Sequence, residues 1–170
     1  MSRRRCCCTP TIPCDACPSG QAHVEYQVVI AGVAAKLGGC TLGVAPPNGT
    51  YIVSQFADMG DNATSCTWRY CGEQPCNAGD PFAPVLYVAF SIVASVLKVT
   101  LQICIYAGSY ICDGPVTTDT CDGLVVTWQD TPDPLTCDFT AKPLTLQALP
   151  TGYTQNLFDF TVATCLVTAL

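Results

Sequence analysis

Residues 96–106, with the sequence VLKVTLQICIY, decide the fold class of this 170-residue chain. Apolar side chains alternate with more polar ones through the stretch from Leu97 to Tyr106. A β-strand points successive side chains to opposite faces, so this period of two predicts a half-buried strand. The apolar residues 85–93 predict a second strand, and we expect the two to form a hairpin through Ala94 and Ser95.

This region is also apolar enough to raise the question of a membrane span. Residues 84–107 are long enough to cross a bilayer as a helix. Such a helix would hold Lys98 and Gln102 at membrane depth, where charged and polar side chains are costly. We therefore predict that the chain has no membrane span.

Strand patterns continue on both sides of this hairpin. They cover residues 23–31, 50–56, 65–71, 124–129, 144–149 and 158–170. Thirteen Gly, thirteen Pro and eleven Asp, against two Glu, favour tight turns over helix surfaces. The prediction is an all-β fold of about eight strands, an antiparallel β-sandwich of jelly-roll type. It would occupy residues 21–170, behind a Cys- and Pro-rich N-terminal arm of residues 1–20, with Cys66, Trp68 and Tyr70 on one core-facing side.

The charge of the chain limits its partners. The formal net charge is −6, and three of the seven basic residues stand together as Arg3, Arg4 and Arg5. An acidic body repels phosphate backbones, so we predict that it does not bind nucleic acid. Only 12% of the residues are charged. So apolar a chain favours buried contacts between subunits, and we expect a homo-oligomer.

Fourteen cysteines indicate covalent or metal ties. Cys6, Cys8, Cys14 and Cys17 in the arm would suit a four-sulfur zinc site, and structural disulfides are the competing interpretation. The arginines run directly into cysteines with no apolar segment between them, which does not match a secretory signal. A protein made inside a host cell that meets oxidant after lysis reconciles the two observations.

Two further groups of residues bear on chemistry. Asp113, Asp119 and Asp122 lie in one predicted loop that would suit calcium, although turn formation alone also explains them. His23 is the single histidine, and no GxSxG motif accompanies it. We therefore expect no enzyme activity, and no cofactor beyond a structural zinc or calcium ion.

Aromatic residues on the predicted strands have two interpretations. The candidates are Trp68, Trp128, Tyr51 and Tyr153. Exposed together, they would form a platform on which sugar rings stack, and glycan would then be a partner. Aromatic residues on strands more often belong to the core, and both interpretations stay open at this point.

A short motif adds a resemblance. After the Cys-Cys-Cys cluster come Cys40, then Asn48-Gly49-Thr50-Tyr51, then Cys66-Thr67-Trp68. This pattern, within residues 1–70, resembles a loose group of uncharacterised Cys-rich β-sandwich proteins, some associated with bacterial viruses and prophages. The chain departs from it by an insertion at residues 42–47. The resemblance implies a structural or attachment component of a particle, with no catalytic residues to carry over.

These observations lead to one functional expectation and one alternative. The expectation is a non-enzymatic virion structural protein, either a capsid decoration or a tail or fibre component. Its partners would be other virion subunits and copies of itself, and its location the virion. The alternative is an extracellular carbohydrate-binding module exported by an unusual route.

Overall fold

The computed structural model describes residues 23–36, 46–56, 65–70, 85–94, 96–104, 110–111, 114–115, 125–130, 137–149 and 158–170. Their regular structure is all strand: β1 (Glu25–Ala31), β2 (Ala34–Ala35), β3 (Gly49–Phe56), β4 (Ser65–Tyr70), β5 (Val85–Val93), β6 (Val96–Cys104), β7 (Tyr110–Ile111), β8 (Gly114–Pro115), β9 (Val125–Asp130), β10 (Lys142–Ala148), β11 (Phe158–Asp159) and β12 (Thr164–Ala169). The prediction of an all-β fold is confirmed. In the described ranges no helix is long and apolar enough to cross a membrane.

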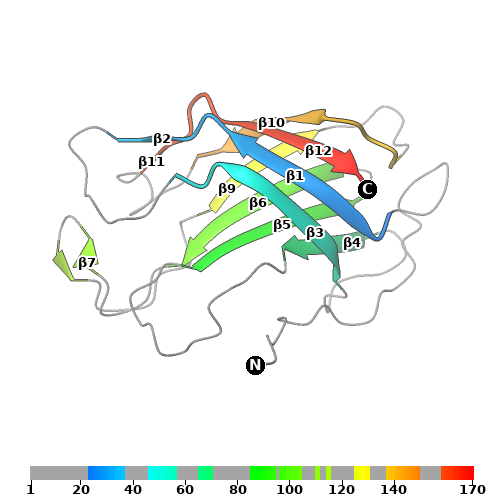
Figure 1. Cartoon of the computed structure of the whole chain (residues 1–170), viewed down its shortest axis with the longest axis horizontal. Coiled ribbons are helices and arrows are strands. Elements are labelled where there is room, and N and C mark those ends of the chain that lie inside the picture. Colours follow the sequence, from blue (N-terminus) through cyan, green and yellow to red (C-terminus); the bar gives the residue numbers. More distant parts are fainter. Residues whose placement is uncertain are drawn as a thin grey trace.

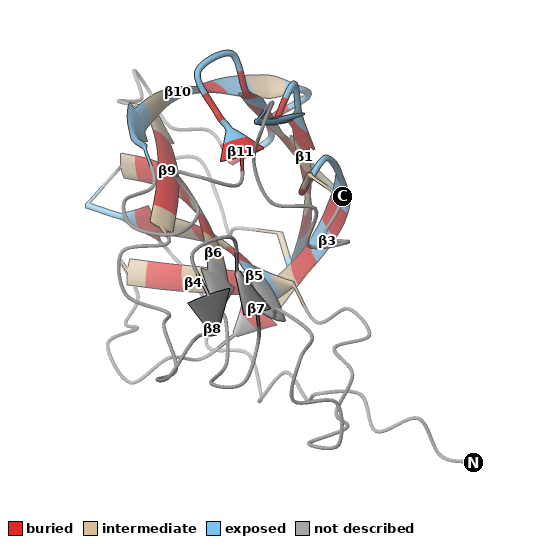
Figure 2. Cartoon of the chain, turned by 90° about the vertical axis from the view of Figure 1, so that its left-hand side faces the viewer, coloured by how far each residue is buried: buried red, intermediate tan, exposed pale blue. Residues whose placement is uncertain are grey.

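Eight of the strands form one closed barrel, in the order β1-β12-β10-β9-β6-β5-β4-β3. Neighbouring strands are antiparallel throughout, and β1 closes the sheet by pairing with both β12 and β3. Figure 1 shows the long strands lying side by side, and Figure 2 shows them arranged in a ring, with buried residues coloured red along the strands. The prediction of a two-sheet sandwich is corrected to a closed main sheet, accompanied by two small two-stranded sheets, β11-β2 and β7-β8. Alternation of apolar and polar residues is the same in both architectures, so it does not distinguish them.

The predicted hairpin is present. Val93 of β5 pairs with Val96 of β6, so the chain reverses between these two residues, as predicted. Ala94 has a φ of 48°, in the left-handed region that matches the twist of a two-residue hairpin. Gly or Asn usually takes this position, and the sequence has neither there, so the local turn signal was weak.

The last predicted strand, residues 158–170, is interrupted. The Asp159 carboxylate accepts hydrogen bonds from the Thr161 amide at 2.8 Å and from its hydroxyl at 2.5 Å. The Ala163 amide then donates to the Phe160 carbonyl at 3.0 Å and closes a turn. Phe160 is buried, but the turn leaves Val162 73% exposed, and β12 begins only at Thr164. Short side chain-to-backbone bonds of this kind compete with strand pairing.

Aromatic side chains fill one end of the barrel interior. Trp68 is fully buried, with its ring centroid 5.1 Å from that of Tyr26 and 5.2 Å from that of Phe90. Its Nε1 donates to the His23 carbonyl at 2.9 Å. The prediction that Cys66, Trp68 and Tyr70 face inward is confirmed, with Tyr70 packed at the margin of the core.

Cysteines contribute to the same core. Cys66 and Cys137 are buried there, and each of the two takes part in a disulfide. Cys165 is a buried free thiol, and burial raises its pKa to about 12 because the thiolate is disfavoured away from water. A wider disulfide network across the other cysteines stays a prediction.

Candidate functional site

A hollow of about 350 Å³ lies at the barrel wall where β4 ends and β5 and β6 continue. The residues that line it are Arg69, Tyr70, Tyr87, Val88, Ala89, Thr100 and Gln102. We call it the β5 hollow. Strand register explains its shape, because Ala89 pairs with Arg69 on one side and with Thr100 on the other. The small Ala89 side chain thus lies between two larger ones on the outer surface of the sheet.

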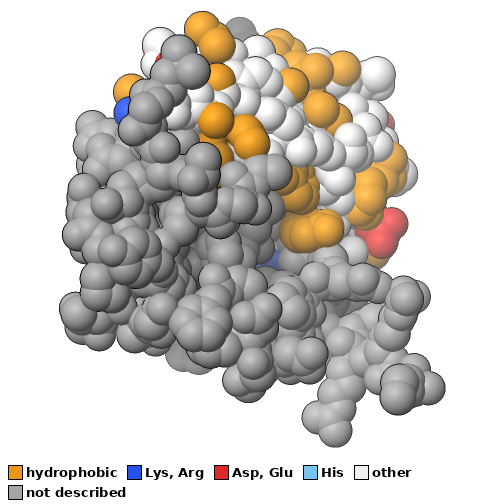
Figure 3. Space-filling view, turned by 60° about the vertical axis from the view of Figure 1, so that its left-hand side comes forward, with side chains coloured by type: hydrophobic (Ala, Val, Ile, Leu, Met, Phe, Trp, Pro, Cys, Tyr) orange, Lys and Arg blue, Asp and Glu red, His pale blue; other side chains and the backbone are white. Residues whose placement is uncertain are grey.

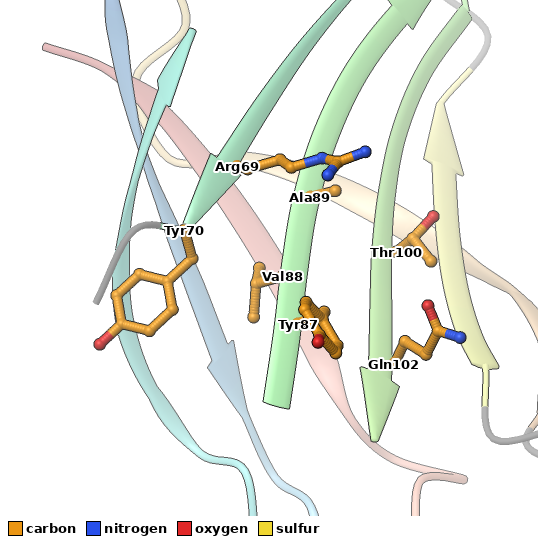
Figure 4. Close-up of a pocket in the computed structure, with 7 residues that line it drawn as sticks. All are labelled: Arg69, Tyr70, Tyr87, Val88, Ala89, Thr100 and Gln102. Atoms are coloured by element: carbon orange, nitrogen blue, oxygen red, sulfur yellow. The ribbon is translucent and has the colours of Figure 1, made fainter. Parts of the chain in front are cut away.

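Polar and aromatic groups surround this small residue. Tyr87 is paired with Gln102 across the β5–β6 ladder, and its side chain is 40% exposed. Figure 4 shows the Arg69 side chain reaching across β5 beside Ala89, with Tyr87, Thr100 and Gln102 following along β5 and β6. The hollow therefore combines an exposed aromatic ring with a guanidinium, a hydroxyl and a side-chain amide.

One wall of the β5 hollow is held by the core. Tyr70 points away from the polar group in Figure 4, and its ring meets Tyr51 edge-on at a centroid distance of 5.2 Å. The Tyr51 hydroxyl donates to the Pro47 carbonyl at 2.9 Å, and burial raises the pKa of Tyr51. Packing on one side and strand pairing on the other fix the backbone of the hollow.

A second surface feature is the outer side of four neighbouring strands, β3, β1, β12 and β10. The outward side chains described on them are Thr50, Ile52, Ser54, Glu25, Gln27, Val29, Ala31, Thr164, Leu166, Thr168, Pro143, Thr145 and Gln147. We call this set the β1 face. Among them only Glu25, at one end, is charged, and its carboxylate accepts a hydrogen bond from the Ser54 hydroxyl at 3.2 Å. Figure 3 shows that the described part of one side of the molecule is largely apolar or uncharged.

His23 joins three parts of the chain. Its Nδ1 donates to the Leu170 carbonyl at 2.9 Å, and its Nε2 pairs with the Asp138 carboxylate. Both partners accept hydrogen bonds, so the doubly protonated ring satisfies both. The hydrogen bond to Asp138 first, and then the bond to Leu170, raise the pKa of His23 above its usual 6.5. His23 therefore fastens the start of β1 to the end of β12 and to the segment that precedes β10.

The metal-site predictions lie outside the described residues. This holds for Cys6, Cys8, Cys14 and Cys17, and for Asp113, Asp119 and Asp122. In the part of the chain that is described, no three His, Cys, Asp or Glu side chains are grouped as a metal site would require. The zinc and calcium sites remain predictions.

The predicted sugar platform is corrected for three of its four aromatics. Trp68 and Trp128 are fully buried and Tyr51 is 8% exposed, while Tyr153 lies outside the described residues. Among the residues whose burial is described, the exposed aromatic side chain is instead Tyr87, which was not among the four candidates. Tyr87 alternates along β5 with Val88 and Phe90, which are buried, and this alternation was the signal available for finding it.

Comparison with protein-family models, with curated proteins and with solved structures finds no match for this chain.

Proposed function

We propose that this chain is a non-enzymatic structural protein of a virus particle, a capsid decoration or a tail or fibre component, in which barrels associate with copies of themselves and with other virion subunits. The observation that carries the proposal is the β1 face, which spans four strands with one charged side chain at its end.

Electrostatics favours self-association through this face. The chain carries a formal net charge of −6, so two copies repel each other over most approaches. Contact through an uncharged surface avoids placing like charges opposite one another and avoids burying unpaired charges. Depletion of charge at the centre of a contact is also the compositional feature of protein interfaces.

The side chains at the centre of the β1 face suit such a contact. Val29 pairs with Leu166 of β12 on one side and with Thr50 of β3 on the other. Ile52 is the next residue after Thr50 on the same face of β3. Ile52 is 39% exposed. The β-branched side chains of Val, Ile and Thr lose little conformational entropy when they are buried, so burying them in a contact between subunits costs little free energy.

The particle assignment rests on the chain as a whole. Copies arranged by closed symmetry would form the decoration or fibre, and the virion would expose the cysteines to oxidant after lysis. The resemblance to Cys-rich proteins associated with bacterial viruses supports the same assignment.

Sequencing the genes on either side of this one tests the virion role. We expect it to reveal other particle components, and a neighbourhood of secreted metabolic enzymes would argue against a virion role.

Light scattering on the purified full chain tests self-association. We expect a defined oligomer, and we expect Val29→Lys to reduce it to a smaller species by placing a charge at the centre of the β1 face. Val93→Lys is the matched control, because Val93 is 47% exposed at the hairpin end of β5, outside the β1 face. A parent chain that is monomeric at all concentrations, or an oligomer unaffected by Val29→Lys, would overturn the assembly proposal.

A further inference from the structure

We propose that the β5 hollow binds a saccharide, with Tyr87 as the ring on which the sugar stacks and Arg69, Thr100 and Gln102 as the groups that bond its hydroxyls. This function goes beyond the proposed assembly role. It uses β4, β5 and β6, whereas the β1 face belongs to β3, β1, β12 and β10, so both surfaces can be occupied at once.

The shape of the β5 hollow suits a small ring. Its volume of about 350 Å³ lies at the lower end of the range for small-molecule sites, which run from roughly 300 to 1,000 Å³. Ala89 sets its depth, since any larger residue between Arg69 and Thr100 would fill the space. The hollow therefore has room for one or two sugar rings.

The residues that line the hollow offer partners for both the apolar face and the hydroxyl groups of a sugar. A pyranose has an apolar C–H face and a rim of hydroxyls. The Tyr87 side chain offers an apolar ring face with a polar tip, and it is 40% exposed. The guanidinium of Arg69 and the amide of Gln102 are planar groups, and together with the Thr100 hydroxyl they supply both donors and acceptors.

Charge narrows the ligand class further. Arg69 is the cation among the described residues that line the hollow. The chain as a whole is acidic, which disfavours nucleic acids and other polyanions. A neutral sugar, or one that bears a single carboxylate, is compatible with this balance.

A glycan array that carries neutral and uronic-acid-containing oligosaccharides, followed by calorimetric titration of the best binder, tests the proposal on the full chain. We expect the parent to bind, and Tyr87→Ala to weaken the affinity by about tenfold or more because the stacking surface is removed. Ala89→Met should produce a similar loss by filling the hollow. Preference for the uronic acid would assign Arg69 to the carboxylate, and preference for the neutral sugar would assign it to hydroxyls.

Two variants serve as controls. Tyr87→Phe retains the ring and should stay within about threefold of the parent. Val93→Ala, on the same strand outside the hollow, should leave binding unchanged. Melting temperatures of all variants should match the parent, which separates loss of binding from loss of folding. A parent chain that binds no glycan of either kind, or binding that survives both Tyr87→Ala and Ala89→Met, would overturn the saccharide site without affecting the assembly proposal.

Discussion

Replacing Trp68 by alanine should cost about 4 kcal/mol of unfolding free energy, because Trp68 anchors the aromatic end of the barrel. Its side chain is fully buried between Tyr26 and Phe90, at centroid distances of 5.1 and 5.2 Å. Truncation of a buried large aromatic residue costs roughly 3–5 kcal/mol. The variant also leaves the His23 carbonyl without the indole donor now at 2.9 Å, worth about 1 kcal/mol. We place the total within the range for truncation because the protein can relax around the lost ring.

Equilibrium unfolding in urea, followed by circular dichroism, measures this change without relying on tryptophan fluorescence. Thermal unfolding gives a second measurement. Since a chain of this size loses about 2–4 °C of melting temperature per kcal/mol of unfolding free energy, we expect the melting temperature to fall by on the order of 8–16 °C. Trp68→Phe retains most of the ring and loses the indole donor, so it should cost about 1–2 kcal/mol. Val93→Ala, an exposed site, should be close to neutral.

A Trp68→Ala variant that unfolds within about 1 kcal/mol of the parent would refute the packing argument. Loss of glycan binding at unchanged stability would refute it in another way, since it would place the indole at the surface rather than in the core.

Four other outcomes follow from the sequence and the structure. The pKa of His23 is raised in the folded chain, so the stability that the charged ring contributes is complete below the unfolded pKa of 6.5 and is lost as pH rises through the folded pKa. The difference in unfolding free energy between the parent and His23→Gln should therefore shrink from about pH 5 to pH 9. A difference that stays constant with pH would contradict the link to Asp138 and Leu170. Gly32→Ala should destabilise by about 1–2 kcal/mol in urea, because Gly32 has a φ of 78° and an added Cβ would lie 2.9 Å from the Val162 carbonyl oxygen; an unchanged midpoint would show that the turn relaxes. Thiol counting on unfolded, unreduced protein should find few free groups, Cys165 among them, and about ten or more without bound metal would rule out a disulfide framework. Deleting residues 1–20 should leave a β-type circular dichroism spectrum but a smaller oligomer, and an unfolded product would show that the arm belongs to the core.

Alternation along the chain was enough to predict most strands and their inward faces. Tyr26, Val28 and Ile30 are buried as their spacing indicates, and so is Trp68. The pattern did not predict closure, because whether a sheet curls into a ring depends on pairings such as β1 with β12, which lie at opposite ends of the sequence. The interruption near Asp159 was also hidden, since Phe158, Phe160 and Val162 keep the spacing of a strand through a turn.

The β5 hollow was less predictable than the core. It depends on Arg69, Ala89 and Thr100 standing in one row, and that row is set by the register of three strands. Period-two reasoning assigns each residue to a face but leaves its cross-strand neighbours unspecified. The cysteine and aspartate sites were proposed from composition and spacing, and they fall on residues that the structure does not describe.

Closure of the main sheet also restricts how copies of this chain can join. In an open sheet the outermost strands present unpaired backbone groups, and another chain can add a strand there and continue into a fibre. The ring formed by β1 and its neighbours has no such outermost strand. Growth of this ring by strand addition is therefore blocked, and contact through the wall of the ring must be made by side chains. Surface substitutions, rather than changes to backbone pairing, would then determine which partners the barrel accepts and how many.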